Sequence, residues 1–179
     1  SFGFPLVALP ILSLVLPIKS AIFLLFFSLI IINAREIKIK NWRKYKKISP
    51  LALGIFLGII FGSIIFHKVD NQFISKIIGV TIIFSAILNY YGLKIKKSFL
   101  ENKSFSLTYG IFSGLIGGMT TIVGPLIVIY LVSLNLKKEP FSELVSLSLF
   151  STLVPLYTIF FIYQKVTVHD FFISAIFII

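Results

Sequence analysis

Long uncharged apolar runs, separated by short charged segments, are the main pattern along this chain. Several of the runs approach or exceed the roughly 18 residues that a membrane-spanning helix needs. They cover residues 1–18, 20–34, 48–66, 77–93, 104–136 and 144–164, and a further run begins at Phe171. The pattern predicts an all-α polytopic membrane protein.

The run 104–136 is the one that a single straight helix explains least well. At about 1.5 Å per residue it would extend for roughly 50 Å, whereas the hydrocarbon core of a bilayer is about 30 Å thick. Its middle contains the residues that interrupt helices, namely Gly117, Gly118, Thr120, Thr121, Gly124 and Pro125. Backbone groups freed there need protein or water around them. Transporters place broken helices of this kind at their substrate sites, so we expect the functional site at this break.

Basic residues are concentrated in two short loops, 35–47 and 94–103. Two predicted spans separate these loops, so both lie on one side of the membrane, and the positive-inside rule makes that side cytoplasmic. If 104–136 crosses once, 137–141 is external and the two halves of the chain are parallel, which is the arrangement we prefer. If it dips and returns, everything after it is inverted, and the few lysines that follow do not decide between the two.

The placement of charge also limits the partners. The net charge of +11 comes from 17 Lys and Arg against 6 Asp and Glu, but the basic residues sit mainly in loops between spans. This indicates a topology signal and contact with anionic lipid, and it argues against nucleic acid. The absence of cysteine excludes disulfides and thiolate metal sites. We expect His67 and His169 at the membrane interface, and we predict neither a metal nor a cofactor.

The polar groups inside the predicted spans are neutral. Every Asp and Glu falls in a loop or near a span end, which argues against a cation transporter and an intramembrane protease. Hydroxyl groups, and the N–H groups of helices that restart after glycine, are hydrogen-bond donors and suit a small anion. Single hydroxyls such as that of Ser113 usually bond a neighbouring carbonyl. Thr120 and Thr121, which lie inside the break, are the stronger candidates.

A faint internal repeat divides the chain. Residues 3–9 align with 123–129 when Pro5 is set on Pro125, and 37–42 resembles 166–171. Paired interrupted segments are typical of duplicated transporters. We therefore predict a first repeat over 1–93, a basic cytoplasmic linker over 94–103 and a second repeat over 104–179.

Glycines also recur at helical spacing. Gly54, Gly58 and Gly62 form a small-xxx-small pattern, which favours close packing of two helices. For Gly114 and Gly118, packing and the lining of a pore remain equally open.

Residues 110–128, GIFSGLIGGMTTIVGPLIV, followed by KKEPF at 137–141, resemble the second-half motif of the sulfite exporter TauE/SafE family. That motif reads roughly G-x-x-S-G-L-x-G-G-x-x-G-I-G-G-P, and GFPLVALP at 3–10 resembles its first-half counterpart. The resemblance implies two four-helix repeats that carry small sulfur oxyanions, sulfonates or related organic anions across a bacterial inner membrane. It also implies that the chain lacks most of helix one, the end of helix seven and helix eight. Thr121 and Val123 replace family glycines, and a family Asn is replaced near Thr152.

The sequence therefore predicts a secondary transporter, an exporter of a small anion such as sulfite or an organosulfonate. Its interrupted segments, 3–10 and 117–125, would face each other near the midplane, with the lipid bilayer and the anion as partners. The candidate substrate-binding residues are Gly3, Pro5, Ser113, Gly117, Gly118, Thr120, Thr121, Gly124 and Pro125. Assembly as a homo-oligomer stays open. The alternatives are a non-transporting membrane subunit or scaffold whose glycines serve packing, and an anion channel; an enzyme would need a nucleophile–base pair, which the spans lack.

Overall fold

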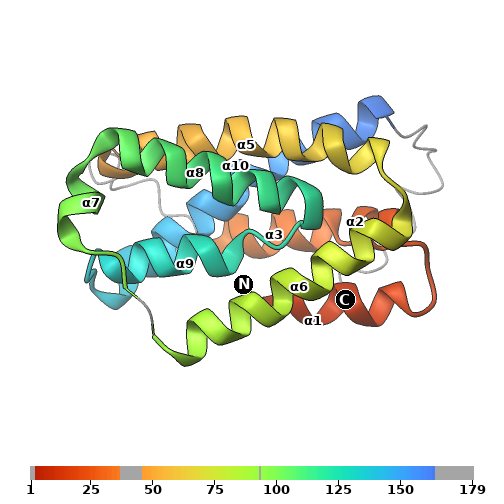
Figure 1. The fold of residues 1–179 in the computed structure, drawn as a ribbon, viewed down its shortest axis with the longest axis horizontal. Coiled ribbons are helices and arrows are strands. Elements are labelled where there is room, and N and C mark those ends of the chain that lie inside the picture. Colours follow the sequence, from red (N-terminus) through yellow and green to blue (C-terminus); the bar gives the residue numbers. More distant parts are fainter. Residues whose placement is uncertain (1–2, 37–45, 93, 164–179) are drawn as a thin grey trace.

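The computed structural model describes residues 3–36, 46–92 and 94–163, and within these ranges the chain forms helices and no strands. Most of the helices run back and forth along one long axis (Figure 1). In chain order they are α1 (Gly3–Ser13), α2 (Ile18–Leu24), α3 (Phe26–Glu36), the 3-10 turn η2 (Lys46–Ile48), α5 (Ser49–Lys68), α6 (Asn71–Tyr90), α7 (Lys97–Glu101), α8 (Lys103–Thr120), α9 (Gly124–Ser133) and α10 (Lys138–Tyr163). The prediction of an all-α membrane protein is confirmed.

Within the part of the chain that the structure describes, three helices are long and apolar enough to cross a membrane: α5, α10 and the Asn71–Leu88 part of α6. Two of them begin earlier than the apolar pattern predicts. At α6, the Asp70 carboxylate accepts a 2.7 Å hydrogen bond from the N–H of Phe73 and caps the first turn. At α10, Glu139 lies in the first turn, where a carboxylate stabilises the helix dipole.

The two N-terminal runs form shorter helices than predicted. The run 1–18 contributes α1, which ends at Ser13, and Pro17 then precedes α2. The run 20–34 is divided at Leu25 between α2 and α3. Much of the first basic loop with Trp42, the segment 166–171 with His169, and the run from Phe171 lie outside the described residues.

Two rows of glycine join α5 to α8. A β-carbon added to Gly54, Gly58 or Gly62 would lie 2.2–2.3 Å from a carbonyl oxygen of α8. The converse holds for Gly110, Gly114 and Gly118, whose β-carbons would meet carbonyl oxygens of α5 at 2.3–2.6 Å. The pairing advances in step along both helices, so α5 and α8 are parallel and in backbone contact. The packing role predicted for the α5 glycines is confirmed, and Gly114 and Gly118 serve packing too.

The run 104–136 forms an antiparallel helical hairpin, which corrects our preference for a single crossing. The hydroxyls of Ser106 and Tyr130 are 2.7 Å apart, and the Tyr109 hydroxyl donates to the carbonyl of Leu126 at 2.8 Å. Later residues of α8 thus contact earlier residues of α9, as in an antiparallel pair. Figure 1 shows α9 returning to the end of the molecule where α8 begins. Because α10 starts from that same end, 137–141 lies at the end of the molecule where α5 and α8 begin, and the order of directions is the inverted one.

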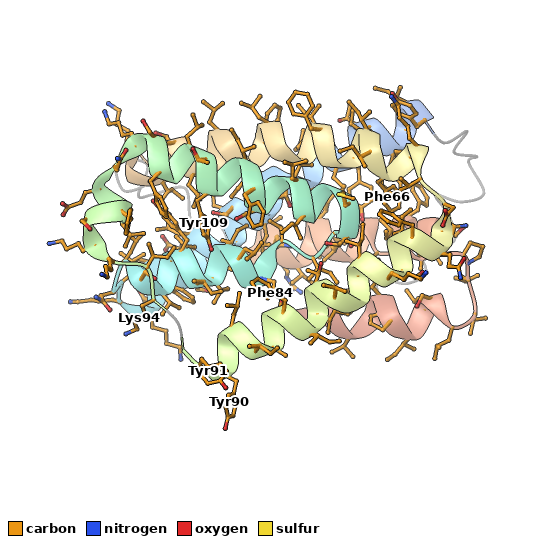
Figure 2. The ribbon with its side chains drawn as sticks, viewed as in Figure 1. Phe66, Phe84, Tyr90, Tyr91, Lys94 and Tyr109 are labelled. Atoms are coloured by element: carbon orange, nitrogen blue, oxygen red, sulfur yellow. The ribbon has the colours of Figure 1, made fainter. Side chains whose placement is uncertain are left out.

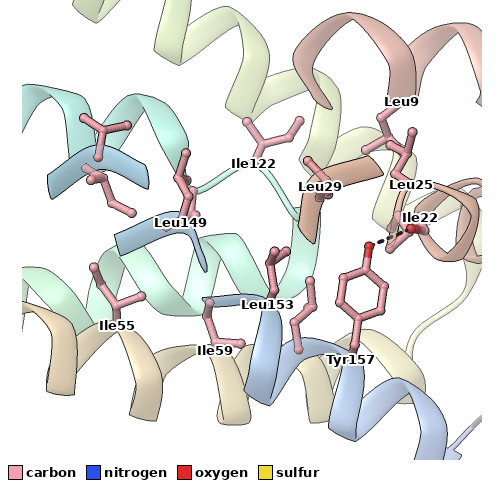
Figure 3. Packing of buried hydrophobic residues seen from close by; sticks show 14 of the residues in the cluster. Leu9, Ile22, Leu25, Leu29, Ile55, Ile59, Ile122, Leu149, Leu153 and Tyr157 are labelled. Carbon is pink, nitrogen blue, oxygen red and sulfur yellow. Dashed lines mark hydrogen bonds between the residues drawn. The ribbon is translucent and has the colours of Figure 1, made fainter. Parts of the chain in front are cut away.

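Apolar side chains from most of the helices form one core. It includes Leu9 of α1, Ile22 and Leu29 of α2 and α3, and Ile122 from the connection between α8 and α9 (Figure 3). The hydroxyl of Tyr157 on α10 reaches across this core and donates to the carbonyl of Ile22 at 3.0 Å. The core therefore fixes the break between α8 and α9 against the N-terminal helices.

The outer faces of the helices are apolar as well. Large side chains such as Phe61, Val80, Ile83 and Ile162 are at least 60% exposed, as expected for surfaces that face lipid. Tyr90 and Tyr91 project from the end of α6 close to the basic segment that starts with Lys94 (Figure 2). Tyrosine beside lysine is typical of a membrane–water interface, so this end of the molecule marks one membrane surface.

Candidate anion site at the break between α8 and α9

The break is formed by Thr121, whose backbone adopts the left-handed conformation with φ of 61°. Its N–H donates to the carbonyl of Gly117 at 2.7 Å, which closes the last turn of α8. Pro125 lies in the first turn of α9, where the missing N–H of proline costs nothing. The prediction that the helix is interrupted here is thus confirmed, and the next helix begins at Gly124. β-Branched residues rarely adopt positive φ, so Thr121 holds a strained backbone position that glycine would occupy freely.

Both threonine hydroxyls of the break are engaged by the backbone. The Thr120 hydroxyl donates to the carbonyl of Ile116 at 2.8 Å and accepts from the N–H of Ile122 at 3.1 Å. The Thr121 hydroxyl donates to the carbonyl of Thr120 at 2.6 Å. These groups therefore stabilise the interruption, and each would have to exchange a backbone partner to bind a ligand.

The two predicted glycines of α8 face different neighbours. Gly118 lies against α5, where an added β-carbon would be 2.6 Å from the carbonyl oxygen of Ile59. Gly117 lies against the connection itself, and its β-carbon would be 2.6 Å from that of Val123. Gly117 thus allows the chain to turn back closely after α8, whereas Gly118 belongs to the glycine contact with α5.

The donors that remain at the break belong to the first turn of α9. The first N–H groups of a helix have no acceptor within it, and here these include the N–H groups of Gly124 and Leu126. Both residues are buried. They carry the positive end of the α9 dipole, and the C-terminal, negative end of α8 lies next to it along the chain. The break therefore combines oriented backbone dipoles with low exposure to water.

A polar seam connects this break to the opposite end of the hairpin. Ser106, Tyr109, Ser113, Gly117 and Thr120 recur at helical spacing along α8, and Ser106, Tyr109 and Gly117 contact α9 or the residues before it. The hydroxyl of Ser113 is buried and bonds no backbone group, and the Tyr109 hydroxyl is its side-chain neighbour. A buried hydroxyl that lacks a backbone acceptor is a common feature of ligand sites.

Ser106 and Tyr109 were not among the predicted site residues. Their spacing along an uncharged run was visible in the sequence, but the pattern did not say which helix would face them. A third residue missed is Glu143, which sits in the second turn of α10 and is only 7% exposed. Its sequence position near a predicted span end did not reveal that it would be buried.

Gly3 and Pro5 lie in the first turn of α1, which packs mainly against α2. The part of α1 that meets the core around the break is Leu9, which shares an apolar cluster with Ile122 and Val123 (Figure 3). Leu9 and the break thus belong to one apolar cluster, and the meeting of 3–10 with 117–125 at a polar site stays a prediction. Gly117, Thr120, Thr121, Gly124 and Pro125 are brought together by the hairpin itself, and Ser113 lies one turn further along α8.

Comparison with known proteins agrees with this architecture. No curated protein and no solved structure matches the chain. The sequence model of the family described as sulfite exporter TauE/SafE matches residues 1–179, which is the whole chain. An all-α membrane protein whose central helix is interrupted at a glycine-rich break fits that match, and the chain belongs to the TauE/SafE family of sulfite exporter-type transporters.

Proposed function

We propose that this protein is a secondary transporter that exports a small anion, such as sulfite, an organosulfonate or a related sulfur oxyanion, across the inner membrane of a prokaryote. The substrate would bind at the break between α8 and α9. The observation that carries the proposal is the buried N-terminus of α9, because its N–H groups and its dipole favour an anion. Membership of a transporter family supports the same conclusion and argues against an enzyme.

The seam along α8 supplies the remaining part of the proposed site. Ser113 has a buried hydroxyl that bonds no backbone group, so donating to an anion would cost at most its interaction with the Tyr109 hydroxyl. The hydroxyls of Thr120 and Thr121 would join by exchanging their backbone acceptors. In this arrangement Gly117 and Pro125 shape the break, and Gly118 contributes indirectly by holding α8 against α5.

A pair of serine variants tests the proposal. Uptake of labelled sulfite into proteoliposomes is measured for the wild-type protein, Ser113→Ala and Ser63→Ala. Both serines are buried and neither hydroxyl bonds a backbone group, but Ser63 lies on α5, outside the seam. A hydrogen bond to a charged ligand contributes about 1.5–3 kcal/mol, so Ser113→Ala should lower uptake by roughly tenfold or more. Equal rates for the two variants would remove Ser113 from the site.

We also propose that the basic loops face the cytoplasm. Lys46, at the end of the first basic loop, and Lys97 and Lys103 of the second line one cavity, so the described end of the first loop lies beside the second loop. The positive-inside rule assigns this end to the cytoplasm. Accessibility of a cysteine introduced at Lys97 to a membrane-impermeant maleimide in intact cells tests the orientation, since labelling from outside would reverse it.

A non-transporting scaffold is the second candidate. The observation in its favour is that six glycines of α5 and α8 are used for helix packing. A scaffold predicts no sulfite uptake by the wild-type protein, and it predicts a partner protein that stays bound through purification. An anion channel would share the proposed site, and single-channel currents would distinguish it from a carrier.

A further inference from the structure

A cavity of about 900 Å³ opens at the end of the molecule where the described end of the first basic loop lies beside the second loop. It lies among η2, the start of α5, the segment that contains α7 and the start of α8, and the end of α9. Among the described residues, three lysines and one glutamate supply its charged groups: Lys46, Lys97, Lys103 and Glu101. Lys97 and Glu101 approach each other at 3.7 Å and are both largely exposed to solvent. The cavity therefore keeps an excess of positive charge.

Hydroxyl groups line the deeper part of this cavity. Ser106 and Tyr130 are 3% and 1% exposed and join their hydroxyls at 2.7 Å. Ser133 is also buried, and its hydroxyl accepts from the N–H of Ile95 at 2.8 Å while it donates to the carbonyl of Ile129 at 2.7 Å. Lysines thus lie at the mouth of the cavity and hydroxyl groups lie at its floor. This arrangement suits an oxyanion that keeps part of its water shell.

The floor of the cavity continues into the seam between α8 and α9. The rings of Tyr130 and Tyr109 have centroids 5.5 Å apart. The Tyr109 hydroxyl then reaches the carbonyl of Leu126, and Ser113 follows one turn later on α8. Tyr109 lies between α8 and α9 in Figure 2, on the line that leads from the basic end to the break. Polar residues therefore recur along α8 from the floor of the cavity to Ser113, towards the buried N-terminus of α9.

We propose that this cavity is a separate oxyanion-binding site, a vestibule that concentrates the anion before it enters the seam between α8 and α9. The inference rests on the proposed function only for the choice of sulfite as the ligand. A phosphate of an anionic lipid headgroup has the same chemistry, and the proximity of the cavity to the membrane surface makes it the second source of an occupant. The cavity is much larger than a bare oxyanion, so the anion is held by long-range charge and water rather than by a rigid shell of donors.

Isothermal titration calorimetry of the purified protein in neutral detergent with sodium sulfite tests the vestibule. The variant is Lys46→Gln/Lys97→Gln/Lys103→Gln. The matched control is Lys94→Gln/Lys137→Gln/Lys138→Gln, which removes the same charge from exposed lysines near the same end that do not line the cavity. An exposed ion pair changes an affinity by roughly twofold to threefold, so the cavity variant should weaken sulfite binding by about tenfold and the control by less than about twofold. Equal dissociation constants for the two variants, or no binding by the wild-type protein, would overturn the proposal.

A second measurement identifies the occupant. The same titration is performed in nanodiscs of phosphatidylcholine, with and without phosphatidylglycerol. Unchanged affinity in the presence of phosphatidylglycerol supports a vestibule for the free anion. If phosphatidylglycerol weakens sulfite binding to the wild-type protein but not to the cavity variant, the site is confirmed and a lipid phosphate fills it. Weakening that is equal in both proteins argues against the cavity as the place of competition.

Different results would refute the proposed vestibule and the proposed transport function. If the wild-type protein shows no sulfite uptake but keeps lysine-dependent sulfite binding, the transporter proposal falls and the vestibule stands. If Ser113→Ala loses uptake while the two lysine variants bind sulfite equally, the site at the break stands and the vestibule falls.

Discussion

The contact between α5 and α8 makes the sharpest prediction about stability. An alanine β-carbon at Gly58 would lie 2.2 Å from the carbonyl oxygen of Ile111 and 2.8 Å from the amide nitrogen of Leu115. Both atoms belong to the backbone, so no side-chain rotation can relieve the clash. A close but permitted carbon–oxygen contact is about 3.3 Å. Gly58→Ala must therefore push the two helices apart by about 1 Å.

The cost follows from the lost contacts. A gap of 0.5–1 Å forfeits roughly a quarter to a half of the dispersion energy of the atoms it separates. Adding a methyl group to a packed interior typically costs 1–3 kcal/mol. Because six glycines share this interface, the separation affects its whole length, and we expect Gly58→Ala to lower the free energy of unfolding by about 2–3 kcal/mol.

Reversible unfolding by sodium dodecyl sulfate in mixed micelles, followed by far-ultraviolet circular dichroism, measures this free energy. Gly79→Ala is the matched control, because Gly79 lies inside α6 and a β-carbon there meets nothing within 4 Å. Alanine is the better helix former by about 1 kcal/mol, so the control should be as stable as the wild type or slightly more. If the two variants unfold within about 0.5 kcal/mol of each other, the backbones of α5 and α8 are not in contact and the reasoning is refuted.

Two further predictions concern the break. Thr121→Gly should be at least as stable as the wild type in the same unfolding assay, because the left-handed backbone costs a β-branched residue about 1–2 kcal/mol. Thr121→Val keeps this strain and loses the hydrogen bond to Thr120, so it should be less stable than the wild type by about 1 kcal/mol. If Thr121→Val were the more stable of the two variants, the backbone of Thr121 would not be strained. Thr120→Val leaves the buried N–H of Ile122 without its acceptor and should lower the free energy of unfolding by about 1–3 kcal/mol. Thr120→Ser keeps the hydroxyl and should be nearly as stable as the wild type. An equal loss of stability in both variants would show that packing of the methyl group matters and the hydrogen bond does not.

At the candidate site, residue types and spacing predicted the interruption of the helix but not the hydrogen bonds of its side chains. The residues 117–125 contain enough glycine, threonine and proline to predict that the helix is interrupted, and the structure places the interruption at Thr121. The same residues did not reveal that the hydroxyls of Thr120 and Thr121 are turned onto the backbone. That outcome depends on local geometry, since a freed carbonyl in a buried break takes the nearest donor.

The direction of the chain after the break could not be predicted from the sequence. Either a single crossing or a hairpin satisfies the apolar pattern of 104–136, and the short charged segments beyond it carry too little charge to choose. The choice is made by contacts between distant positions, above all Ser106 with Tyr130 and Tyr109 with Leu126. The internal repeat, the division of the chain at 93 and 103, and the meeting of 3–10 with the break at a polar site stay predictions.

The sequence by itself determined the membrane class, the long apolar helices, the position of the central break and the clustering of positive charge, because each of these depends on composition and on spacing along one segment. The tertiary structure alone decided that α8 and α9 form a hairpin, that the glycines of α5 face those of α8, and that lysines from two loops share one cavity with Ser106 and Tyr130. Lipid is nearly as apolar as the helix surfaces, so the hydrophobic effect that buries a helix in the membrane does not select its neighbour. That selection comes from close backbone contact and a few hydrogen bonds, which exist only once the helices have been brought together.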